Sequence, residues 1–211
     1  MTLDVYADIA CPWCYIGEAH LRTALSARPG LAVERRWRPF QLQPRMPPTG
    51  LGRDFFARKF GGEAEMAAAF AHAARAGAAA GLRFDFDALA GAPNSLDAHR
   101  LVLLAGVYGR TWEAAGALFE AYFAHGRDLS DAGDLVAAAE AAGVPGADAR
   151  ALLGDDRYRD AVVASQAEAA RLGIRGVPFV VLDGRVGVSG AQPPEAFVEA
   201  LDRAAAGSTV A

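Results

Sequence analysis

The chain opens with an alternation of apolar and polar positions, and a different spacing follows. Residues 3 to 9 place Leu3, Val5, Ala7 and Ile9 on one face and Asp4, Tyr6 and Asp8 on the other. Such alternation predicts a strand with one buried and one polar face. From Pro12 onward Cys14, Leu21 and Leu25 fall on one stripe at about 100° per residue, which predicts a helix with Cys14 on its buried side.

The first helix ends at Pro29-Gly30, and a second strand is predicted over residues 31 to 39. Its inward side carries Leu31, Val33 and Trp37. A strand, a helix and a second strand in this order are typical of a parallel pair with a helical crossover.

Helical spacing dominates from about residue 41 to residue 159, after the Pro/Gly-rich connection "QLQPRMPPTGLG". We expect further helices at residues 131 to 142 and 156 to 172, and no strand or internal repeat in this region. The apolar stripes are Met66, Phe70 and Ala73, then Leu96, His99, Leu103 and Val107, then Ala115, Leu118, Phe119 and Tyr122.

Strand spacing returns near the end of the chain. An apolar strand over 179 to 182, the turn pair Asp183-Gly184 and a returning strand over 185 to 188 predict a β-hairpin. The segment "QPPEAFVEALDRAAA" predicts a closing helix whose inward residues are Phe197, Val198 and Leu201.

These elements predict an α/β fold in which the two ends of the chain share one small mixed sheet. Residues 1–40 and 160–211 then form a discontinuous domain, and residues 41–159 form an all-helical insertion domain.

Composition narrows the function classes. The chain has 211 residues, a hydrophobic fraction of 53% and a formal net charge of −4. These values indicate a globular chain, and the charge gives no support for a nucleic-acid partner. No apolar run approaches the roughly 18 residues that span a bilayer, so we expect no membrane insertion. The first residues lack the basic region of a signal peptide, so we expect a cytoplasmic location.

The chain has only two cysteines, Cys11 and Cys14, separated by Pro12 and Trp13. A structural zinc site needs four ligands, and the four histidines show no matching spacing, so we expect no metal. A disulfide that closes so short a loop adds little stability, and a lasting structural disulfide is unusual in a reducing compartment. The remaining interpretation of the two cysteines is a reactive dithiol.

The helix stripe gives the two sulfurs different tasks. Cys11 lies at the N-terminal tip, where the helix dipole and unpaired N–H groups stabilise a thiolate. It can attack a disulfide, and Cys14, buried one turn further on, can resolve the mixed disulfide. Pro12 suits the first helical turn. We expect Trp13 to be exposed, either packing on a substrate peptide or shielding the disulfide.

The late segment "GVPF" provides a second candidate element. The Val177–Pro178 bond can be cis, which would leave the Val177 backbone available to pair with an extended substrate. Alternatively, Pro178 only starts a strand. The residues alone do not decide between these two interpretations.

Three further residues each have a structural and a functional interpretation. Asn94 and Asp97 resemble a capping box, although their helix could also line a groove that faces Cys11. His99 is either a core histidine or a base. Asp8 either assists proton transfer at Cys14 or lies on the polar face of its strand.

The CPWC motif, the late Gly-Val-Pro, the hairpin and the helical insertion occur in the order typical of the DsbA family of dithiol oxidoreductases, which the chain resembles. The segments "CPWCYIG", "NSLDAHRL", "LFEAYF" and "GIRGVPFVV…VSGAQ" resemble the FrnE-like branch. The resemblance implies a thioredoxin-like fold with a large all-α insertion, Cys11 as nucleophile, Cys14 as resolving thiol and Val177–Pro178 as a cis-proline loop. It implies no cofactor beyond the redox-active disulfide, and protein or small-molecule thiols and disulfides as partners of a monomer or homodimer.

Two alternatives remain beside dithiol exchange. 2-Hydroxychromene-2-carboxylate isomerases and kappa-class glutathione transferases share this architecture, but they generally carry serine at the position of Cys11. The segment "SGAQ" also lacks the acidic and basic pair expected for glutathione binding, so both departures favour exchange, with glutathione still a candidate redox partner. A chaperone-like binder that uses the groove between domains is the non-catalytic alternative. The direction of electron flow is open.

Overall fold

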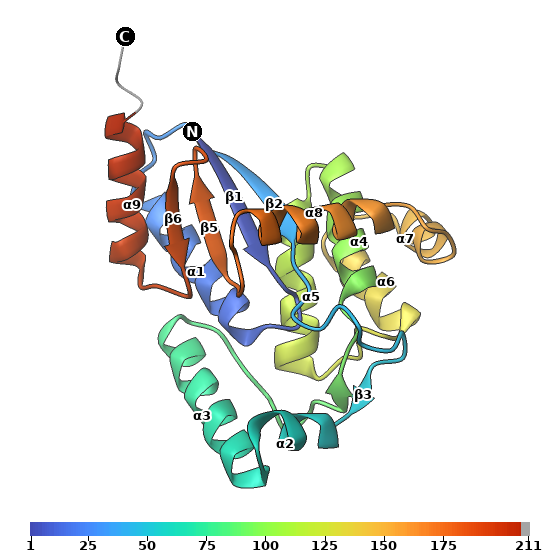
Figure 1. Ribbon diagram of the computed structural model, residues 1–211. Helices are drawn as coiled ribbons and strands as arrows, with labels where there is room; N and C mark the ends of the chain where they lie inside the picture. The colour runs from blue at the N-terminus through green and yellow to red at the C-terminus, as the bar shows by residue number, and fades with distance from the viewer. Residues whose placement is uncertain (208–211) are drawn as a thin grey trace.

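The two ends of the chain build one mixed sheet, as Figure 1 shows. The computed structural model describes residues 1–207, and its main sheet contains β1 (Thr2–Ala7), β2 (Glu34–Pro39), β5 (Phe179–Leu182) and β6 (Val186–Ser189). Their spatial order is β2-β1-β5-β6. β1 is parallel to β2 and antiparallel to β5, which confirms the predicted mixed sheet.

The opening of the chain forms the predicted parallel unit. Helix α1 (Pro12–Ser26) connects β1 to β2, and Pro12 occupies its first turn, where the missing N–H costs no hydrogen bond. The register pairs Val5 with Trp37. β1 ends at Ala7 and α1 begins at Pro12, so only four residues connect them. Cys11 is the last of these four and therefore lies at the end of the sheet.

The predicted hairpin turn is present between β5 and β6. Asp183 and Gly184 have φ angles of 47° and 66°, the positive values that a two-residue type I′ turn requires. The returning strand starts at Val186, one residue later than expected. The backbone N–H of Thr2 donates to the Asp183 carboxylate at 2.7 Å and ties the turn to the start of β1.

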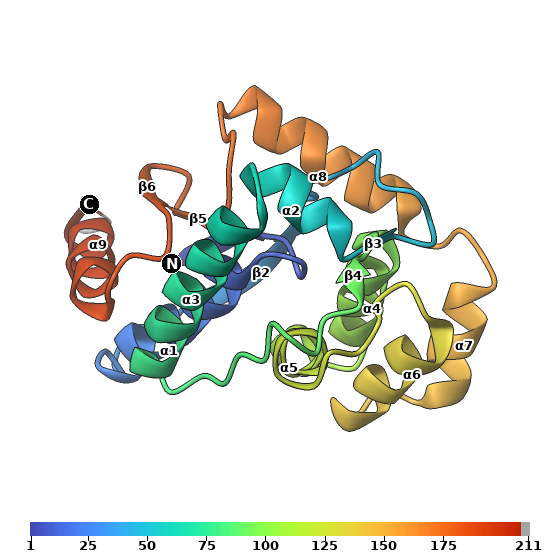
Figure 2. The ribbon, with the colours of Figure 1, turned by 90° about the horizontal axis from the view of Figure 1, so that it is seen from below.

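The sheet is covered on both faces (Figures 1 and 2). α1 and α9 (Pro194–Gly207) pack on one face, and α8 (Arg159–Arg171) packs on the other. Tyr6 is only 1% exposed, in a cluster with Ala169 and Ile174. The prediction of a polar second face on the first strand is therefore wrong at Tyr6 and at Asp8, the residue after β1, because later segments of the chain bury both residues.

Helices fill most of the segment between β2 and α8. They are α2 (Asp54–Phe60), α3 (Glu63–Ala79), α4 (Leu96–Val107), α5 (Thr111–His125), α6 (Ala132–Ala141) and α7 (Gly146–Leu153). The predicted stripe on α5 is fully buried. The predicted buried stripe on α4 is wrong at Val107, which is 70% exposed, because Val107 is the last residue of the helix.

A two-stranded sheet of β3 (Leu51–Gly52) and β4 (Gly91–Ala92) interrupts the helices. The expectation of no strand in this region is wrong, since two residues are too few for any alternation to show. A Cβ at Gly91 would lie 2.1 Å from the carbonyl oxygen of Leu51, so only glycine permits this pairing.

One hydrophobic core connects the sheet layer with the helices. It includes Val5 and Leu201 from the sheet layer as well as Phe119 and Leu135 from the helices. The division into residues 1–40 with 160–211 and residues 41–159 stays a prediction, and positions 208–211 lie outside the described residues. Over residues 1–207, no helix has both the length and the apolar character that crossing a bilayer requires.

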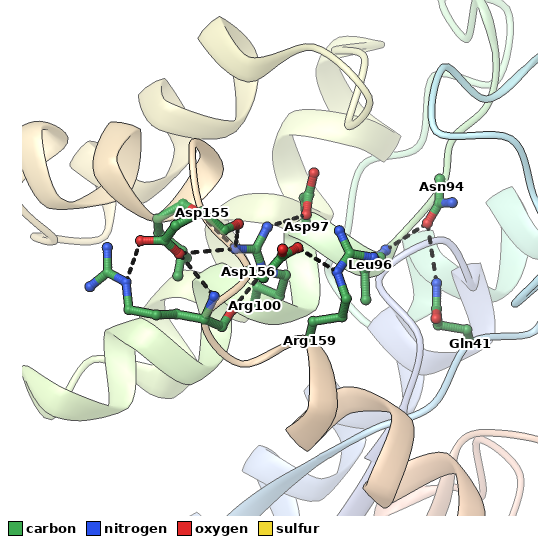
Figure 3. Close-up of polar contacts among 10 residues, drawn as sticks. Gln41, Asn94, Leu96, Asp97, Arg100, Asp155, Asp156 and Arg159 are labelled. Atoms are coloured by element: carbon green, nitrogen blue, oxygen red, sulfur yellow. Dashed lines mark hydrogen bonds and ion pairs between the residues drawn. The ribbon is translucent and has the colours of Figure 1, made fainter.

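A buried arginine fastens the chain between α7 and α8 to α4 (Figure 3). Arg100 is 1% exposed. Its guanidinium donates to the carbonyl oxygens of Leu152, Asp155 and Arg157, and it pairs with the Asp97 carboxylate at 2.7 Å. The carbonyls of Asp155 and Arg157, which lie outside the helices, thereby gain a partner. The Leu152 carbonyl at the end of α7 gains a second one beside the N–H of Asp155.

We expect Arg100→Met to lower the free energy of unfolding by about 1.5–3 kcal/mol, because three buried or partly buried carbonyls lose a charged donor. Urea unfolding followed by circular dichroism measures this change. Arg110→Met is the matched control, since Arg110 forms an exposed pair with Glu113 and its loss costs about 1 kcal/mol or less. Equal effects for the two variants would show that Arg100 does not fasten this segment.

Candidate active site

The turn between β1 and α1 places both cysteines at the N-terminus of the helix. Cys11 is the residue before the first turn, with extended backbone, and its carbonyl oxygen accepts the N–H of Cys14 at 3.0 Å. Both thiols are free, with Cys11 4% and Cys14 1% exposed. The predicted burial of Cys14 is confirmed, and Cys11 is also largely covered.

The predicted loop around Pro178 faces Cys11. The Sγ atom of Cys11 lies 3.8 Å from the Val177 carbonyl oxygen, and the Val177–Pro178 peptide bond is cis. The N–H of Gly190 donates to the Pro178 carbonyl at 2.8 Å and holds the loop against the end of β6. The fold therefore brings together residues that lie 166 positions apart in the sequence.

Gly17 is a site residue that the sequence reasoning missed. A Cβ at this position would lie 2.9 Å from Cγ of Pro178 and 3.5 Å from Cα of Ala191. The absence of a side chain lets α1 approach the loop closely. One sequence feature could have indicated this role. Gly17 follows Cys14 by three residues and so lies on the same face of α1, the face that packs near Pro178.

The environment of Cys14 keeps its thiol protonated. Burial raises the pKa of Cys14 well above its usual range, and the neighbouring sulfur of Cys11 adds to this effect. The backbone N–H of Asp8 donates to Sγ of Cys14 at 3.4 Å and favours negative charge there. Cys14 thus stays a thiol at neutral pH until it reacts.

Asp8 lies under Cys14 and is 1% exposed, so its expected place on a polar strand face is wrong. Its carboxylate accepts the N–H groups of Leu42 at 2.7 Å and Ala10 at 3.1 Å. Burial by itself would raise the pKa of Asp8, but the contact with His99 and the hydrogen bond from Leu42 outweigh it and leave this pKa below its usual range.

His99 completes a buried chain of contacts behind Asp8. The indole N–H of Trp37 donates to Nδ1 of His99 at 3.3 Å. Since an indole N–H only donates, Nδ1 is the acceptor and a ring proton lies on Nε2. Nε2 lies 3.4 Å from Oδ1 of Asp8. His99 is thus a core histidine that is hydrogen-bonded through Nδ1, while Nε2 only lies near Asp8, and Trp37 is the partner that the sequence did not reveal.

Asn94 organises the start of α4, and its contacts with Gln41 and Leu96 are drawn in Figure 3. Its side-chain oxygen accepts the N–H of Leu96 at 2.9 Å and Nε2 of Gln41 at 3.2 Å, and its amide donates to the Met46 carbonyl at 2.7 Å. The structural interpretation of Asn94 holds in this form. The proposed capping box is wrong at Asp97, whose carboxylate binds Arg100 instead.

Trp13 is half-buried rather than exposed, because α3 lies beside the tip of α1. Its ring lies 5.2 Å from the ring of His72 on α3. Deeper along α1, Tyr15 stacks on Phe119 of α5 at 5.0 Å. The helical segment thus forms one wall of the site, and only part of Trp13 remains available for contact.

A mixed sheet with helices on both faces, and a Cys-Pro-Trp-Cys dithiol at the start of the first helix, defines a thioredoxin-fold protein. The family model of the DSBA-like thioredoxin domain matches residues 2–202. The chain belongs to this family, as its motifs led us to expect.

Solved structures with the same fold include two kinds of enzyme, oxidoreductases and an isomerase. A probable DsbA oxidoreductase from Streptomyces coelicolor has 36% identity and a TM-score of 0.92, covering 100% of this chain and 92% of its own. The cytosolic disulfide reductase DsbM from Pseudomonas aeruginosa, solved with GSH, has 22% identity and a TM-score of 0.67, with coverage of 96% and 98%.

A 2-hydroxychromene-2-carboxylate isomerase is similar in fold as well. It has 16% identity and a TM-score of 0.74, and the match covers 99% of this chain and 98% of the isomerase. At this identity the likeness concerns the fold alone. No curated protein matches the chain.

We expect iodoacetamide to leave Cys14 unlabelled in the reduced, folded protein near neutral pH, because its raised pKa and burial keep the thiol protonated and covered. Labelling of Cys14 should become appreciable only at pH values above the usual thiol range of about 8.5, or after unfolding in urea. Peptide mass spectrometry after timed alkylation measures both sites. If Cys14 in the folded protein were labelled as fast as in an unfolded control, its thiol would be neither covered nor held protonated.

We expect Gly17→Ala to destabilise the fold and to slow reactions at Cys11, because the new methyl group would displace the rigid Pro178 ring. Overpacking costs about 1–3 kcal/mol, which outweighs the roughly 1 kcal/mol gained from alanine in a helix. Thermal unfolding and Cys11 alkylation rates measure the two effects. Gly116→Ala on α5, where a Cβ meets nothing within 4 Å, should instead stabilise the protein. A stabilised Gly17→Ala would refute the close approach.

Proposed function

We propose that the chain is a thiol–disulfide oxidoreductase whose Cys11/Cys14 dithiol exchanges with protein or small-molecule disulfides. The observation that supports this most is the different setting of the two sulfurs. Cys11 precedes the first turn of α1 and faces Val177, whereas Cys14 is buried with a raised pKa. An attacking thiol and a protected resolving thiol need this asymmetry.

The reaction balances in two steps. The Cys11 thiolate attacks one sulfur of a substrate disulfide, so that a mixed disulfide forms and the other substrate sulfur leaves as a thiolate. Cys14 then loses its proton, attacks Sγ of Cys11 and releases the second substrate thiol. The protein dithiol gives up two electrons and two protons in total, and one disulfide is reduced to two thiols. The reverse sequence oxidises a dithiol.

Asp8 and His99 are positioning residues in this proposal. The N–H of Asp8 points at the sulfur of Cys14 and stabilises the charge that develops there during the second attack. The Asp8 carboxylate, held by Leu42 and by the His99 ring, fixes this N–H in place. Asn94 acts one step further away, since it orders the connection that contains Gln41 and Met46.

The proposed substrate contacts are Pro12, Trp13, Val177 and Pro178, which surround Cys11. Among residues 1–207 the Val177 N–H has no hydrogen-bond partner, so an extended substrate segment can pair with it. We assign the chain to the FrnE-like branch on the segments "CPWCYIG" and "NSLDAHRL". We further propose a cytoplasmic location, with glutathione as redox partner, because the cytosolic reductase of the same fold was solved with GSH.

We expect Cys11→Ser to abolish disulfide exchange, because the attacking sulfur is lost, whereas Cys14→Ser should accumulate a mixed disulfide at Cys11 that is not resolved. Stopped-flow exchange with a fluorescent peptide disulfide and intact-mass measurement of the adduct test the two variants. The unreactive Cys11→Ser variant should unfold at the same denaturant concentration as the reduced wild type. Exchange that survives Cys11→Ser, or a glutathione-dependent isomerisation that survives it, would overturn the proposal.

A further inference from the structure

An apolar cavity of about 90 Å³ lies against the cysteine motif. Ala10 and Pro12, the neighbours of Cys11 on either side, form part of its wall together with Trp13. The rest of the wall comes from α2, α3, α5 and the segment before β4, and Figure 2 shows α3 lying alongside α1. Most of these residues are aromatic: Phe56, Phe60, Phe70, Phe86, Tyr122 and Phe123.

The size of the cavity selects its occupant. Its volume of about 90 Å³ lies far below the roughly 300–1,000 Å³ of pockets that take drug-sized ligands. This space accommodates one ring or one branched group rather than a folded surface or a length of peptide. Its aromatic walls favour an aromatic ring, since such pairs gain about 0.5–1.5 kcal/mol beyond their buried area.

The cavity carries one cation, and that cation is exceptional in the sequence. Lys59 is the only lysine among the 211 residues. It is exposed, lines the cavity and lies 5.8 Å from the centre of the Phe60 ring. Within the part of the chain that the structure describes, Lys59 has no ion-pair partner, whereas its neighbour Arg58 pairs with Asp54 one turn earlier. A free ammonium beside an aromatic cavity complements a ring that carries negative charge.

We propose that this cavity binds the ring of a small anionic aromatic thiol, or of its disulfide, with the anionic group on Lys59 and the sulfur directed at Cys11. The inference deepens the proposed function and rests on it. It names a substrate class that the cysteine motif by itself leaves open.

The chemistry needs no further reactant for one turnover of the reduced protein. Cys11 attacks the aromatic disulfide, and one aromatic thiolate leaves while the other stays bound through sulfur, its ring in the cavity. Cys14 attacks the Cys11 sulfur and expels the second aromatic thiolate. The products are the Cys11–Cys14 disulfide and two aromatic thiols.

The test compares three disulfides under single-turnover conditions with pre-reduced protein. Dithiobis(nitrobenzoate) has a carboxylate on each aromatic ring, dithiodipyridine is aromatic and uncharged, and bis(hydroxyethyl) disulfide is neither aromatic nor charged. Second-order rate constants are compared between variants for each reagent, so differences in intrinsic reactivity between reagents cancel. Thermal unfolding confirms that each variant is folded.

Lys59→Gln should lower the rate constant for dithiobis(nitrobenzoate) about fivefold, the size expected for one partly exposed charge pair. Added salt should reduce this difference. The rate constants for the two uncharged reagents should not change. Arg58→Gln is the matched control, because Arg58 is adjacent in sequence but does not line the cavity.

Ala69→Leu fills the cavity from α3 and should lower the rate constants for both aromatic reagents about tenfold, while bis(hydroxyethyl) disulfide reacts as before. Ala68→Leu is the matched control, since Ala68 is exposed and lies outside the cavity wall. The two substitutions add the same group to neighbouring positions of one helix, so only the location differs.

The outcomes separate the two proposals. If wild-type protein exchanges with none of the reagents, the proposed function fails. If exchange occurs but Lys59→Gln changes all three rates alike, or Ala69→Leu matches Ala68→Leu, the cavity does not receive the ring. A fourth reagent, a peptide disulfide with phenylalanine beside its cysteine, tests another occupant. If Ala69→Leu slows only this reagent, the cavity receives a protein side chain, and the proposal of a small anionic ligand is wrong.

Discussion

The candidate site depends on one buried carboxylate. Asp8 accepts hydrogen bonds from the backbone of Ala10, before α1, and of Leu42, after β2, while its side chain also meets His99 on α4. Three segments that are distant in the sequence are thereby held around one charge. The backbone N–H of the same residue reaches Sγ of Cys14. A buried charge is tolerated only when it is paired in this way, and here the pairing places the Cys14 sulfur.

Local patterns predicted the parts of the fold that local interactions decide. The strand, helix and strand at the start, the hairpin at Asp183-Gly184 and the buried stripe of α5 are all visible as spacings of two or of three to four residues. The covering of Tyr6 by α8 was not predictable, because it depends on a helix more than 150 positions away. The two-residue strands around Gly91 were too short to produce a pattern.

The site was predictable to a similar extent. The CPWC spacing identified the pair of thiols, and the helix stripe distinguished Cys14 on the buried face from Cys11 at the tip of the helix. Gly17 was missed because its importance lies in an absent side chain, which shows only when Pro178 lies against it. Trp13 was expected in solvent because the stripe of α1 says nothing about α3, whose His72 covers one side of the ring.

The composition of the chain gives its single lysine a consequence beyond binding. Since every other basic side chain except the histidines is arginine, a reagent that modifies primary amines has two sites, the N-terminus and Lys59. The N-terminus lies at the start of β1, at the opposite end of that strand from the cysteines. A fluorophore attached to Lys59 would therefore lie beside the cavity wall that Ala10, Pro12 and Trp13 form, without any engineered attachment point.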